Sequence, residues 1–552
     1  MSRQFGLQQI RSSIGVLGGA LALVTGSSVA ALALSSSVGP EGIDARRLHE
    51  APYNVTGAKI AIGQVEIGRP SQFGLDKVAN ADLPVNVRQV FLLDELAGPN
   101  RYVDFHAATV ASVMVSQDKT LTGVAPNAVL YSAAVGPIRG RSGQPDECLS
   151  SQQVALSNGG DVRAINFSFG EPLSRDPRPE PSLDGNALLT RCIDWSTLEH
   201  DVLYVIAGNQ GGGGIPIPTD NFNGINVAYS RRVDGRFVKV DFANLSSEPT
   251  FGPRPSAPPE SNVGTRRSIN IVAPGSDIEV IGPDGSVSTV SGTSFAAPHV
   301  AAAVALVQEW GDRQFRSGRS DWSLDSREPM VTKVVLLNSA DKLEDAGDGL
   351  RLGMSRTLYD EANRTWIDSD AYRDRAIPLH ADLGTGHLNA YRAVLQLDAG
   401  QWVPDEAAVP VIGWSYSAVE GPVPTATSEH LHSHFQDYVF ERPLQGGSYF
   451  SATLAWERLV TLNDSNRNQQ YDIGESFADQ GLNNLDLYLM RAEDTDIANS
   501  VWSSVSAEDS IEHLFTQIPT TGNYKLRVVY QQAVHDATSQ PYALAWWAMG
   551  AH

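Results

Sequence analysis

The chain has 552 residues, 63 acidic and 41 basic, and a formal net charge of −22 at pH 7. A hydrophobic fraction of 42% with 8% aromatic residues is typical of a globular protein with a sizeable core and excludes an intrinsically disordered chain. No basic stripe offsets the acidic charge, which argues against nucleic acid or an anionic membrane as a partner. The length predicts several domains, or one large domain with additions.

The first 34 residues have the pattern of an export signal. Arg3 and Arg11 precede an uncharged apolar run at 14–34, and small residues near 30 and 33 suit a signal peptidase. Uncut, the run is long enough to span a bilayer, but its many Gly and Ser residues favour cleavage. We therefore expect a secreted, periplasmic or cell-surface protein, attached to a membrane only if this segment is retained. Residues 35–56 form an expected N-terminal extension with little room for a folded propeptide.

Residues 57–401 alternate short apolar runs with helix-like segments. This alternation predicts an α/β domain with a mostly parallel sheet and helices on both faces. The expected strands are 58–65, 128–135, 163–169, 201–208, 225–230 and 268–274. The expected helices are 106–115, 150–158, 187–199, 296–310 and 331–338.

The first of these strands lies in IAIGQVEIGRP, Ile60–Pro70, and ends on one carboxylate, Glu66, before a turn at Gly68. Strands often end in a polar residue followed by Gly, so Glu66 taken alone reads as an ordinary strand-end acid. An active-site role needs support from elsewhere in the sequence.

Two further polar residues stand at the ends of expected elements. His106 heads the helix-like segment FHAATVASVMV, although a lone histidine is more often structural than catalytic. Asn209 follows the apolar run DVLYVIAG where a Gly-rich loop begins, at the edge of a parallel sheet where ligand sites usually form. A simple turn asparagine fits the same position.

The chain has two cysteines, Cys148 and Cys192. In an exported protein they can form one disulfide, and two free buried thiols remain an alternative. Their spacing excludes a cysteine-pair metal site.

The strongest chemical pattern is SGTSFAAPHVAAAVALVQEW, Ser291–Trp310, in which Ser294 opens a strongly helical, Ala-rich run. The amides at a helix N-terminus carry a partial positive charge that suits a developing oxyanion. Ser294 is therefore a candidate nucleophile, with an N-cap serine as the alternative. A catalytic serine also needs a general base and a group that orients this base.

Residues 402–552 change in character. Short alternating runs separated by turn residues predict a second, all-β domain, most simply a sandwich. No helix is expected there. The expected strands lie at 438–444, 449–457, 484–492, 524–530 and 542–548.

One loop of this β region, DSNRNQQYDIGE, has the ligand spacing of a calcium loop of the EF-hand type. The usual Gly at its sixth position is Gln469, and no amphipathic helices flank it, so a solvated loop is the alternative. The expected calcium ligands are Asp464, Asn466, Asn468, Gln470 through its carbonyl, Asp472 and Glu475.

Taken together, the segments resemble the subtilisin-like serine proteases, the subtilases, over about residues 57–397. GTSFAAPHVAA resembles the serine block of that family, and HAATVAS followed by GVAPNAVLYSAAV resembles its histidine block. AINFSFG resembles the substrate-binding strand, and VIAGN resembles the oxyanion segment. The order carboxylate, histidine, serine is also that of subtilisin.

The resemblance implies a role for each candidate residue. Ser294 would be the nucleophile and His106 the general base and acid, while the Asn209 side chain and the Ser294 amide would hold the oxyanion. An extended peptide would bind as an added strand. The expected peptide-binding residues are Ser168, Phe169, Gly170 and Gly208.

The chain departs from the family at two places. Ala107–Thr109 stand where members usually read Gly, Thr, His, and the strand-end aspartate falls on Glu66-Ile67-Gly68. Either carboxylate can accept the Nδ1–H of His106, although Glu is longer by roughly 1.5 Å. We therefore predict a Ser-His-Glu triad that accommodates the longer side chain.

The sequence thus predicts a monomeric, exported serine endopeptidase that acts on proteins or peptides through an acyl-enzyme and needs no cofactor for catalysis. The alternative is a catalytically inactive subtilisin fold kept as a protein-binding module, in which Glu66 marks lost catalysis. An esterase is disfavoured because no G-x-S-x-G elbow surrounds Ser294.

Overall fold

The computed structural model describes residues 34–137, 142–208, 217–240, 266–421, 434–535 and 538–551. Residues Ala31–His552 form one compact unit. The predicted export signal therefore lies outside the described residues, apart from its last position. Within the described ranges, no helix combines the length and the apolar composition that crossing a bilayer requires.

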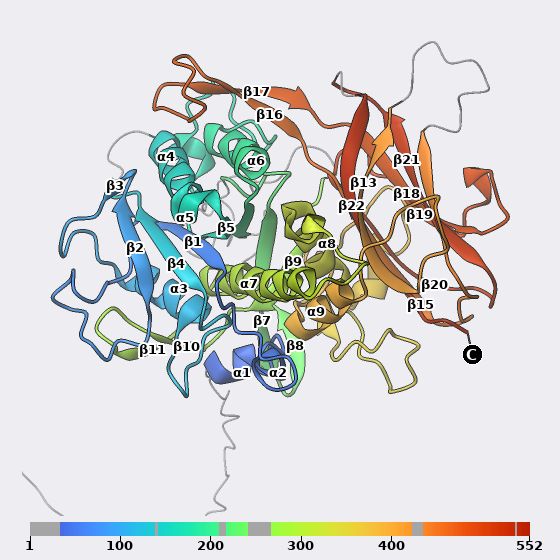
Figure 1. Ribbon diagram of the computed structural model, residues 1–552, viewed down its shortest axis with the longest axis horizontal. Helices are drawn as coiled ribbons and strands as arrows, with labels where there is room; N and C mark the ends of the chain where they lie inside the picture. Colours follow the sequence, from blue (N-terminus) through green and yellow to red (C-terminus); the bar gives the residue numbers. More distant parts are fainter. Residues whose placement is uncertain are drawn as a thin grey trace, which may run out of the picture. The chain divides into compact units, whose positions relative to one another are not determined.

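A ten-stranded sheet lies at the centre of the first four hundred residues (Figure 1). Its order is β12-β8-β7-β6-β5-β1-β4-β2-β3, with β9 beside β7. Its neighbours are parallel except for the pairs β2–β3 and β7–β8, so the predicted mostly parallel sheet is confirmed. Its strands are β1 (Ala61–Glu66), β2 (Val87–Leu92), β3 (Glu95–Leu96), β4 (Val129–Ala134), β5 (Val162–Phe167), β6 (Leu203–Ala207), β7 (Ile225–Val233), β8 (Arg236–Lys239), β9 (Ile271–Pro274) and β12 (Leu358–Tyr359). A separate hairpin is formed by β10 (Ile278–Ile281) and β11 (Val287–Val290).

Helices cover both faces of this sheet. Every residue of β1, β5 and β6 is buried, as expected for parallel strands with helices above and below. Helices α3 and α7 pack against one face, and α4 and α6 pack against the other (Figure 1). The α-helices are α1 (Leu34–Val38), α2 (Arg46–His49), α3 (Phe105–Val115), α4 (Gln144–Ala155), α5 (Ser157–Gly160), α6 (Leu188–His200), α7 (Thr293–Ser317), α8 (Pro329–Asn338) and α9 (Ala390–Asp398).

All five predicted helices are present; three have both ends within two residues of expectation, and α4 and α7 differ by more. Helix α4 begins at Gln144 rather than at residue 150, with Pro145 in its first turn, where a missing N–H costs nothing. Helix α7 begins at Thr293 rather than at residue 296, so it includes Ser294. Short α9 was not predicted, although its apolar face packs on α7 and α8.

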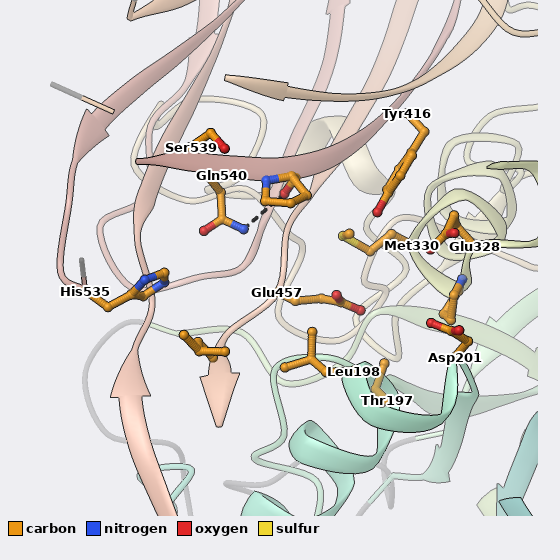
Figure 2. Close-up of a pocket in the computed structure, with 13 residues that line it drawn as sticks. Thr197, Leu198, Asp201, Glu328, Met330, Tyr416, Glu457, His535, Ser539 and Gln540 are labelled. Atoms are coloured by element: carbon orange, nitrogen blue, oxygen red, sulfur yellow. Dashed lines mark hydrogen bonds between the residues drawn. The ribbon is translucent and has the colours of Figure 1, made fainter. Parts of the chain in front are cut away.

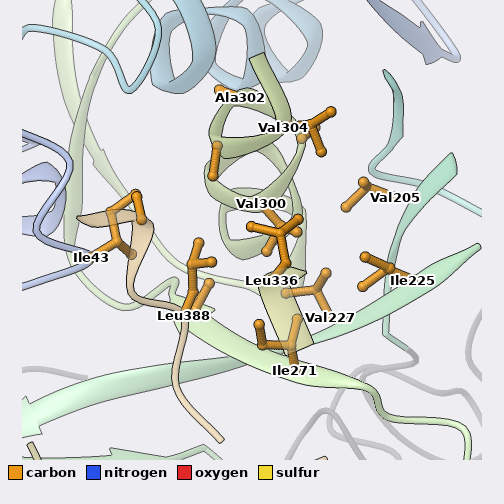
Figure 3. Close-up of a cluster of buried hydrophobic side chains, with 14 of the residues drawn as sticks. Ile43, Val205, Ile225, Val227, Ile271, Val300, Ala302, Val304, Leu336 and Leu388 are labelled. Atoms are coloured by element: carbon orange, nitrogen blue, oxygen red, sulfur yellow. The ribbon is translucent and has the colours of Figure 1, made fainter. Parts of the chain in front are cut away.

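Helix α7 is the centre of the largest hydrophobic core (Figure 3). Val300 and Val304 lie fully buried on this helix, and its many alanines allow strands and helices to approach closely. Around them lie side chains from β6, β7, β9, α8 and two loops. Those labelled in Figure 3 are Val205, Ile225, Val227, Ile271, Leu336, Ile43 and Leu388.

The segment that precedes the first strand belongs to this core. Val38, Ile43 and Leu48 are fully buried in it. Ser37 Oγ and His299 Nε2 of α7 are hydrogen-bonded at 2.8 Å. The Ala390 amide, at the start of α9, donates to the Ile43 carbonyl at 2.8 Å. The predicted extension at 35–56 thus contributes buried residues to the same core as the elements that follow it.

Residues after 401 form antiparallel sheets, which confirms the predicted all-β region. The two four-stranded sheets have the orders β13-β22-β15-β20 and β14-β21-β18-β19, and both contribute to one shared hydrophobic core. The described residues of this region contain no α-helix. The strands are β13 (Ile412–Glu420), β14 (Phe435–Val439), β15 (Tyr449–Ala455), β16 (Leu459–Asn463), β17 (Ser476–Gly481), β18 (Asn484–Arg491), β19 (Trp502–Ser504), β20 (Ile511–Gln517), β21 (Tyr524–Gln532) and β22 (Ser539–Trp547).

Two contacts join the β region to the helices of the first region. The sheet that contains β22 packs against α8 and α9, and Gln396 Nε2 donates to the Trp546 carbonyl at 2.9 Å. The hairpin β16–β17 reaches over α4 and α6, where Tyr471 packs near a disulfide between Cys148 and Cys192. Of the two alternatives for the cysteines, the disulfide is therefore the one present.

Candidate active site

Glu66 and His106 are brought together at the end of β1. His106, in the first turn of α3, donates from Nδ1 to Glu66 Oε2 at 3.2 Å. The Glu66 side chain is only 2% exposed, whereas that of His106 is 40% exposed. A buried carboxylate therefore holds an imidazole that is itself partly exposed. Among the described residues, Glu66 Oε1 has no hydrogen-bond partner.

The chain after Glu66 lies directly against the chain that leads into α3. Arg69 and Val103 form a parallel bridge, with the Arg69 amide donating to the Tyr102 carbonyl at 2.8 Å. Gly68 is required for this approach, because a Cβ at its position would lie 2.3 Å from Cβ of Asp104. Asp104 then caps α3 by accepting the Ala107 amide at 3.0 Å. The close contact between these two segments thus explains why the residue two positions after Glu66 is a glycine.

Electrostatics around His106 favour its charged form. Burial lowers the pKa of His106, but the nearby carboxylates of Glu66 and Asp104 together outweigh burial and hold this pKa above its ordinary value. A carboxylate that stabilises the imidazolium is what a general base requires when it takes a proton from a serine.

Ser294 lies in the first turn of α7, as a nucleophile served by helix N-terminal amides would. It is 8% exposed, and its Oγ donates to the Ser168 carbonyl at 3.1 Å. The next residue, Phe295, packs beside the base, with its ring centroid 5.6 Å from that of His106. Among the described residues, Ser294 and His106 share no hydrogen bond, so attack requires Oγ to turn from Ser168 towards the imidazole.

Pro298 explains how Ser294 is tied to the substrate-binding segment. Proline has no N–H, so the carbonyl four residues earlier, that of Ser294, loses its helical partner. This carbonyl instead accepts from Ser168 Oγ at 2.8 Å. Ser168 directly follows β5, so Ser294 and the end of β5 are joined by two hydrogen bonds. The spacing of four residues between Ser294 and Pro298 is visible in the sequence. It does not tell which donor replaces the missing N–H of the proline.

The expected oxyanion residue, Asn209, lies outside the described residues. Its neighbour Gly208 is held between two elements: its amide donates to the Val227 carbonyl at 2.9 Å, and its carbonyl accepts from Thr293 Oγ1 at 2.9 Å. Thr293, directly before Ser294, therefore ties the end of β6 to the start of α7. Phe169 and Gly170 follow Ser168 in the chain, and Ser168 is the predicted peptide-binding residue that is hydrogen-bonded to Ser294.

Comparison with known proteins identifies the family to which the chain belongs. The profile of the subtilase family matches residues 49–354, more than half of the chain. The chain belongs to the subtilase family. Its members are serine peptidases, and the candidate carboxylate, histidine and serine of this subtilase all lie within the matched residues.

Individual relatives of this subtilase are distant. Subtilisin NAT of Bacillus subtilis subsp. natto is 28% identical over 290 residues, which cover 51% of this chain and 65% of the relative. The chain thus spans just under two thirds of the length of that relative. Subtilisin of Bacillus pumilus is 26% identical over 290 residues, which cover 51% of this chain and 90% of the relative. The solved structure of the prenylagaramide maturation protease PagA shares 21% identity, with a TM-score of 0.41, over 64% of this chain and 97% of that chain.

A cavity lies elsewhere in this subtilase, between α6, α8 and the β region. It has a volume of about 310 Å³, and none of the predicted catalytic residues lines it. Figure 2 shows the carboxyl groups of Asp201, Glu328 and Glu457 directed into one space. The pKa of Glu457 is raised to about 8 and that of Glu328 to about 7, in both cases mainly by burial; nearby acids contribute to both shifts, and Lys333 opposes that of Glu457.

The predicted calcium loop connects β16 and β17. Asp464 accepts the Gln469 amide at 2.8 Å, and Glu475 accepts the Ser465 amide at 2.7 Å. Asn466 and Asn468 both donate to Asp472, at 2.6 and 2.9 Å. The expected contribution of Gln470 is through its carbonyl. Across the described ranges, no three His, Cys, Asp or Glu side chains are arranged to hold a metal ion, so calcium binding stays a prediction.

Proposed function

We propose that this subtilase is an exported serine endopeptidase that cleaves peptide bonds through an acyl-enzyme, with Ser294, His106 and Glu66 as its triad. The observation that carries the proposal is the hydrogen bond from His106 Nδ1 to the buried carboxylate of Glu66 beside the serine helix. It gives the histidine a fixed tautomer whose Nε2 can accept a proton.

The chemistry follows from this arrangement. Ser294 Oγ attacks the scissile carbonyl as His106 Nε2 takes its proton, and Glu66 stabilises the imidazolium that forms. The negative charge on the tetrahedral oxygen is held by the Ser294 amide at the start of α7 and by Asn209. His106 then gives its proton to the leaving amine, and water hydrolyses the ester by the same steps in reverse.

The substrate is an extended stretch of a protein or peptide. The two hydrogen bonds between Ser168 and Ser294 place the backbone of Ser168–Gly170 alongside the nucleophile, where it can pair with a peptide as an added strand. Export rests on the charged start and apolar run of residues 1–34.

Hydrolysis of quenched fluorescent peptides by the purified chain tests this proposal. We expect cleavage at internal bonds, its loss in Ser294→Ala and in His106→Ala, and a melting temperature close to wild type in both variants. Folded wild-type protein that binds these peptides without cleaving them would support the inactive binding module instead.

A further inference from the structure

The loop that leads into His106 is strained. Asn100 and Tyr102 both adopt positive φ, 59° and 56°, although neither is glycine. Such a conformation is energetically costly for a residue with a side chain and persists only where the surroundings hold it in place. Strain of this kind gathers at functional sites, and here it lies within six residues of the candidate base.

The surroundings that hold this loop are one buried ion pair. Arg69 and Asp76 have fully buried side chains and form a bidentate contact, with Nη1 to Oδ2 at 2.6 Å and Nη2 to Oδ1 at 2.8 Å. Neither residue fits the expected triad, and Arg69 comes three residues after Glu66. Arg69 Nη1 also donates to the Pro70 carbonyl at 3.1 Å, and Asp76 Oδ2 accepts the Gln72 amide at 2.9 Å.

Alternate residues of the loop are each bonded to this pair. Arg69 Nη2 donates to the Gly98 carbonyl at 3.1 Å, and the Asn100 amide donates to Asp76 Oδ1 at 2.6 Å. The backbone of Arg69 continues the series, because its amide donates to the Tyr102 carbonyl and its carbonyl accepts the Asp104 amide, at 2.8 and 2.9 Å. The loop 98–104 is thereby fixed from its start to the cap of α3.

We propose that Arg69 and Asp76 are positioning residues that set the separation between the Glu66 carboxylate and His106. The proposal rests on the proposed function, because it assigns the pair to the triad's geometry. Arg69 lies three residues after Glu66 in the chain, and its backbone and side chain hold the loop that leads to His106. A triad carboxylate that is one bond longer than Asp needs the histidine held correspondingly further back, and a misplacement of about 1 Å can cost roughly a hundredfold in rate.

General stability is a weaker explanation for the pair. A buried ion pair contributes little net stability compared with apolar residues of the same volume, because both ions lose their hydration. The same chain offers a matched comparison in Arg356 and Asp341, another buried pair, with the Arg356 Nε 3.0 Å from Asp341 Oδ2. Neither member of that pair belongs to the candidate site.

The test compares Arg69→Met, Arg69→Lys and the control Arg356→Met in the full chain. An NMR titration of the His106 ring measures its pKa without requiring turnover, and peptide hydrolysis measures kcat and KM. For Arg69→Met we expect a lower His106 pKa, a fall of about a hundredfold in kcat and little change in KM. Arg69→Lys should retain part of the wild-type kcat and part of the elevation of the His106 pKa. Arg356→Met should lower the melting temperature while the His106 pKa stays at its wild-type value.

A double variant gives the test a second arm. The pair is proposed to fix a distance between residue 66 and His106 that suits the length of Glu. We therefore expect Glu66→Asp to lower kcat by a smaller factor in the Arg69→Lys background than in wild type. Independent sites do not show such coupling. Active, folded Arg69→Met with wild-type kcat and an unchanged His106 pKa would overturn the positioning role. If wild type itself does not turn over, the proposed function fails, and the titration still decides whether the pair positions His106.

Discussion

Glu66 differs from an aspartate by one carbon–carbon bond, and the structure shows how the site uses this extra length. The side chain reaches from the end of β1 to His106 Nδ1 at 3.2 Å, while the chain that follows it is held against the segment that precedes α3. Gly68 permits that close contact. Among the described residues, the second carboxylate oxygen, Oε1, has no hydrogen-bond partner. We therefore attribute the orientation of the carboxylate to the packing of the backbone around it.

Replacing the charge of Glu66 should change both the rate and its pH dependence. Glu66→Gln is expected to lower kcat by roughly 10³–10⁴, because the amide can no longer fix the tautomer and stabilise the imidazolium. Catalysis needs neutral His106. Because the pKa of His106 is raised, wild-type activity should be lost at a higher pH than an ordinary histidine would give, as the pH falls through that pKa. Since the amide that replaces the carboxylate carries no charge, the residual activity of Glu66→Gln should persist to lower pH.

Profiles of kcat/KM against pH for both proteins measure this prediction. An acidic limb at the same pH in wild type and in Glu66→Gln would contradict the assignment of Glu66 as the partner of His106. Glu95→Gln, at an exposed position on β3, is the matched control and should leave the profile unchanged.

At this scale, the sequence predicted the residues that the structure brings together, Glu66, His106 and Ser294, because each stands at the end or start of an element with a strong pattern. It could not predict the pair Arg69 and Asp76. Their contact depends on how a polar loop folds back on itself, and no periodic pattern records that.

At the scale of elements, the site depends on where strands end and helices begin. Glu66 ends β1, Ser168 follows β5, Gly208 follows β6, and Ser294 lies in the first turn of α7. The strands were predictable because parallel strands buried on both faces are continuously apolar. The extension at 35–56 was not recognised as core, because its buried residues are isolated between prolines, glycines and charges and show no period.

The calcium loop yields a prediction of its own. We propose that residues 464–475 bind Ca²⁺, since Gln469 adopts the positive φ of 62° that glycine usually supplies at the sixth position of such loops. Calcium at a hundredfold excess over Kd should then stabilise the chain by about 2.7 kcal/mol. Glu475→Gln should reduce this gain, because it removes the carboxylate at the twelfth position.

Melting curves of the full chain with calcium and with a chelator measure that gain. Magnesium at the same concentration is the control, because its smaller octahedral shell fits such a loop poorly. A melting temperature that does not respond to calcium would contradict the prediction and leave a loop closed by its own hydrogen bonds.

At the scale of the whole molecule, the β region and the helical region share a cavity lined by acids. Glu457 follows β15, Glu328 precedes α8 and Asp201 follows α6, and all three line one cavity. Burial is the main reason that the pKa of Glu457 is raised, to about 8, and neighbouring acids add to it while Lys333 opposes it. The folded chain therefore binds a proton at Glu457 more tightly than the unfolded chain does.

The sign of the resulting pH dependence is fixed. Stability from a carboxyl with a raised folded pKa is present at low pH and is lost as the pH rises from about 4.5 towards about 8. Glu457→Gln should remove much of that loss, on the order of 2 kcal/mol at pH 8 after allowing for solvent screening, and should change little at pH 4. Urea unfolding at both pH values measures it, and equal losses in wild type and variant would contradict it.

The central claim is that Ser294 is a nucleophile activated by His106 and Glu66. Its most direct test is to treat the purified full-length chain with a fluorophosphonate probe and to map the labelled peptide by mass spectrometry. We predict stoichiometric labelling of Ser294, slower labelling in Glu66→Gln and none in Ser294→Ala. Folded wild-type protein that stays unlabelled would contradict the claim.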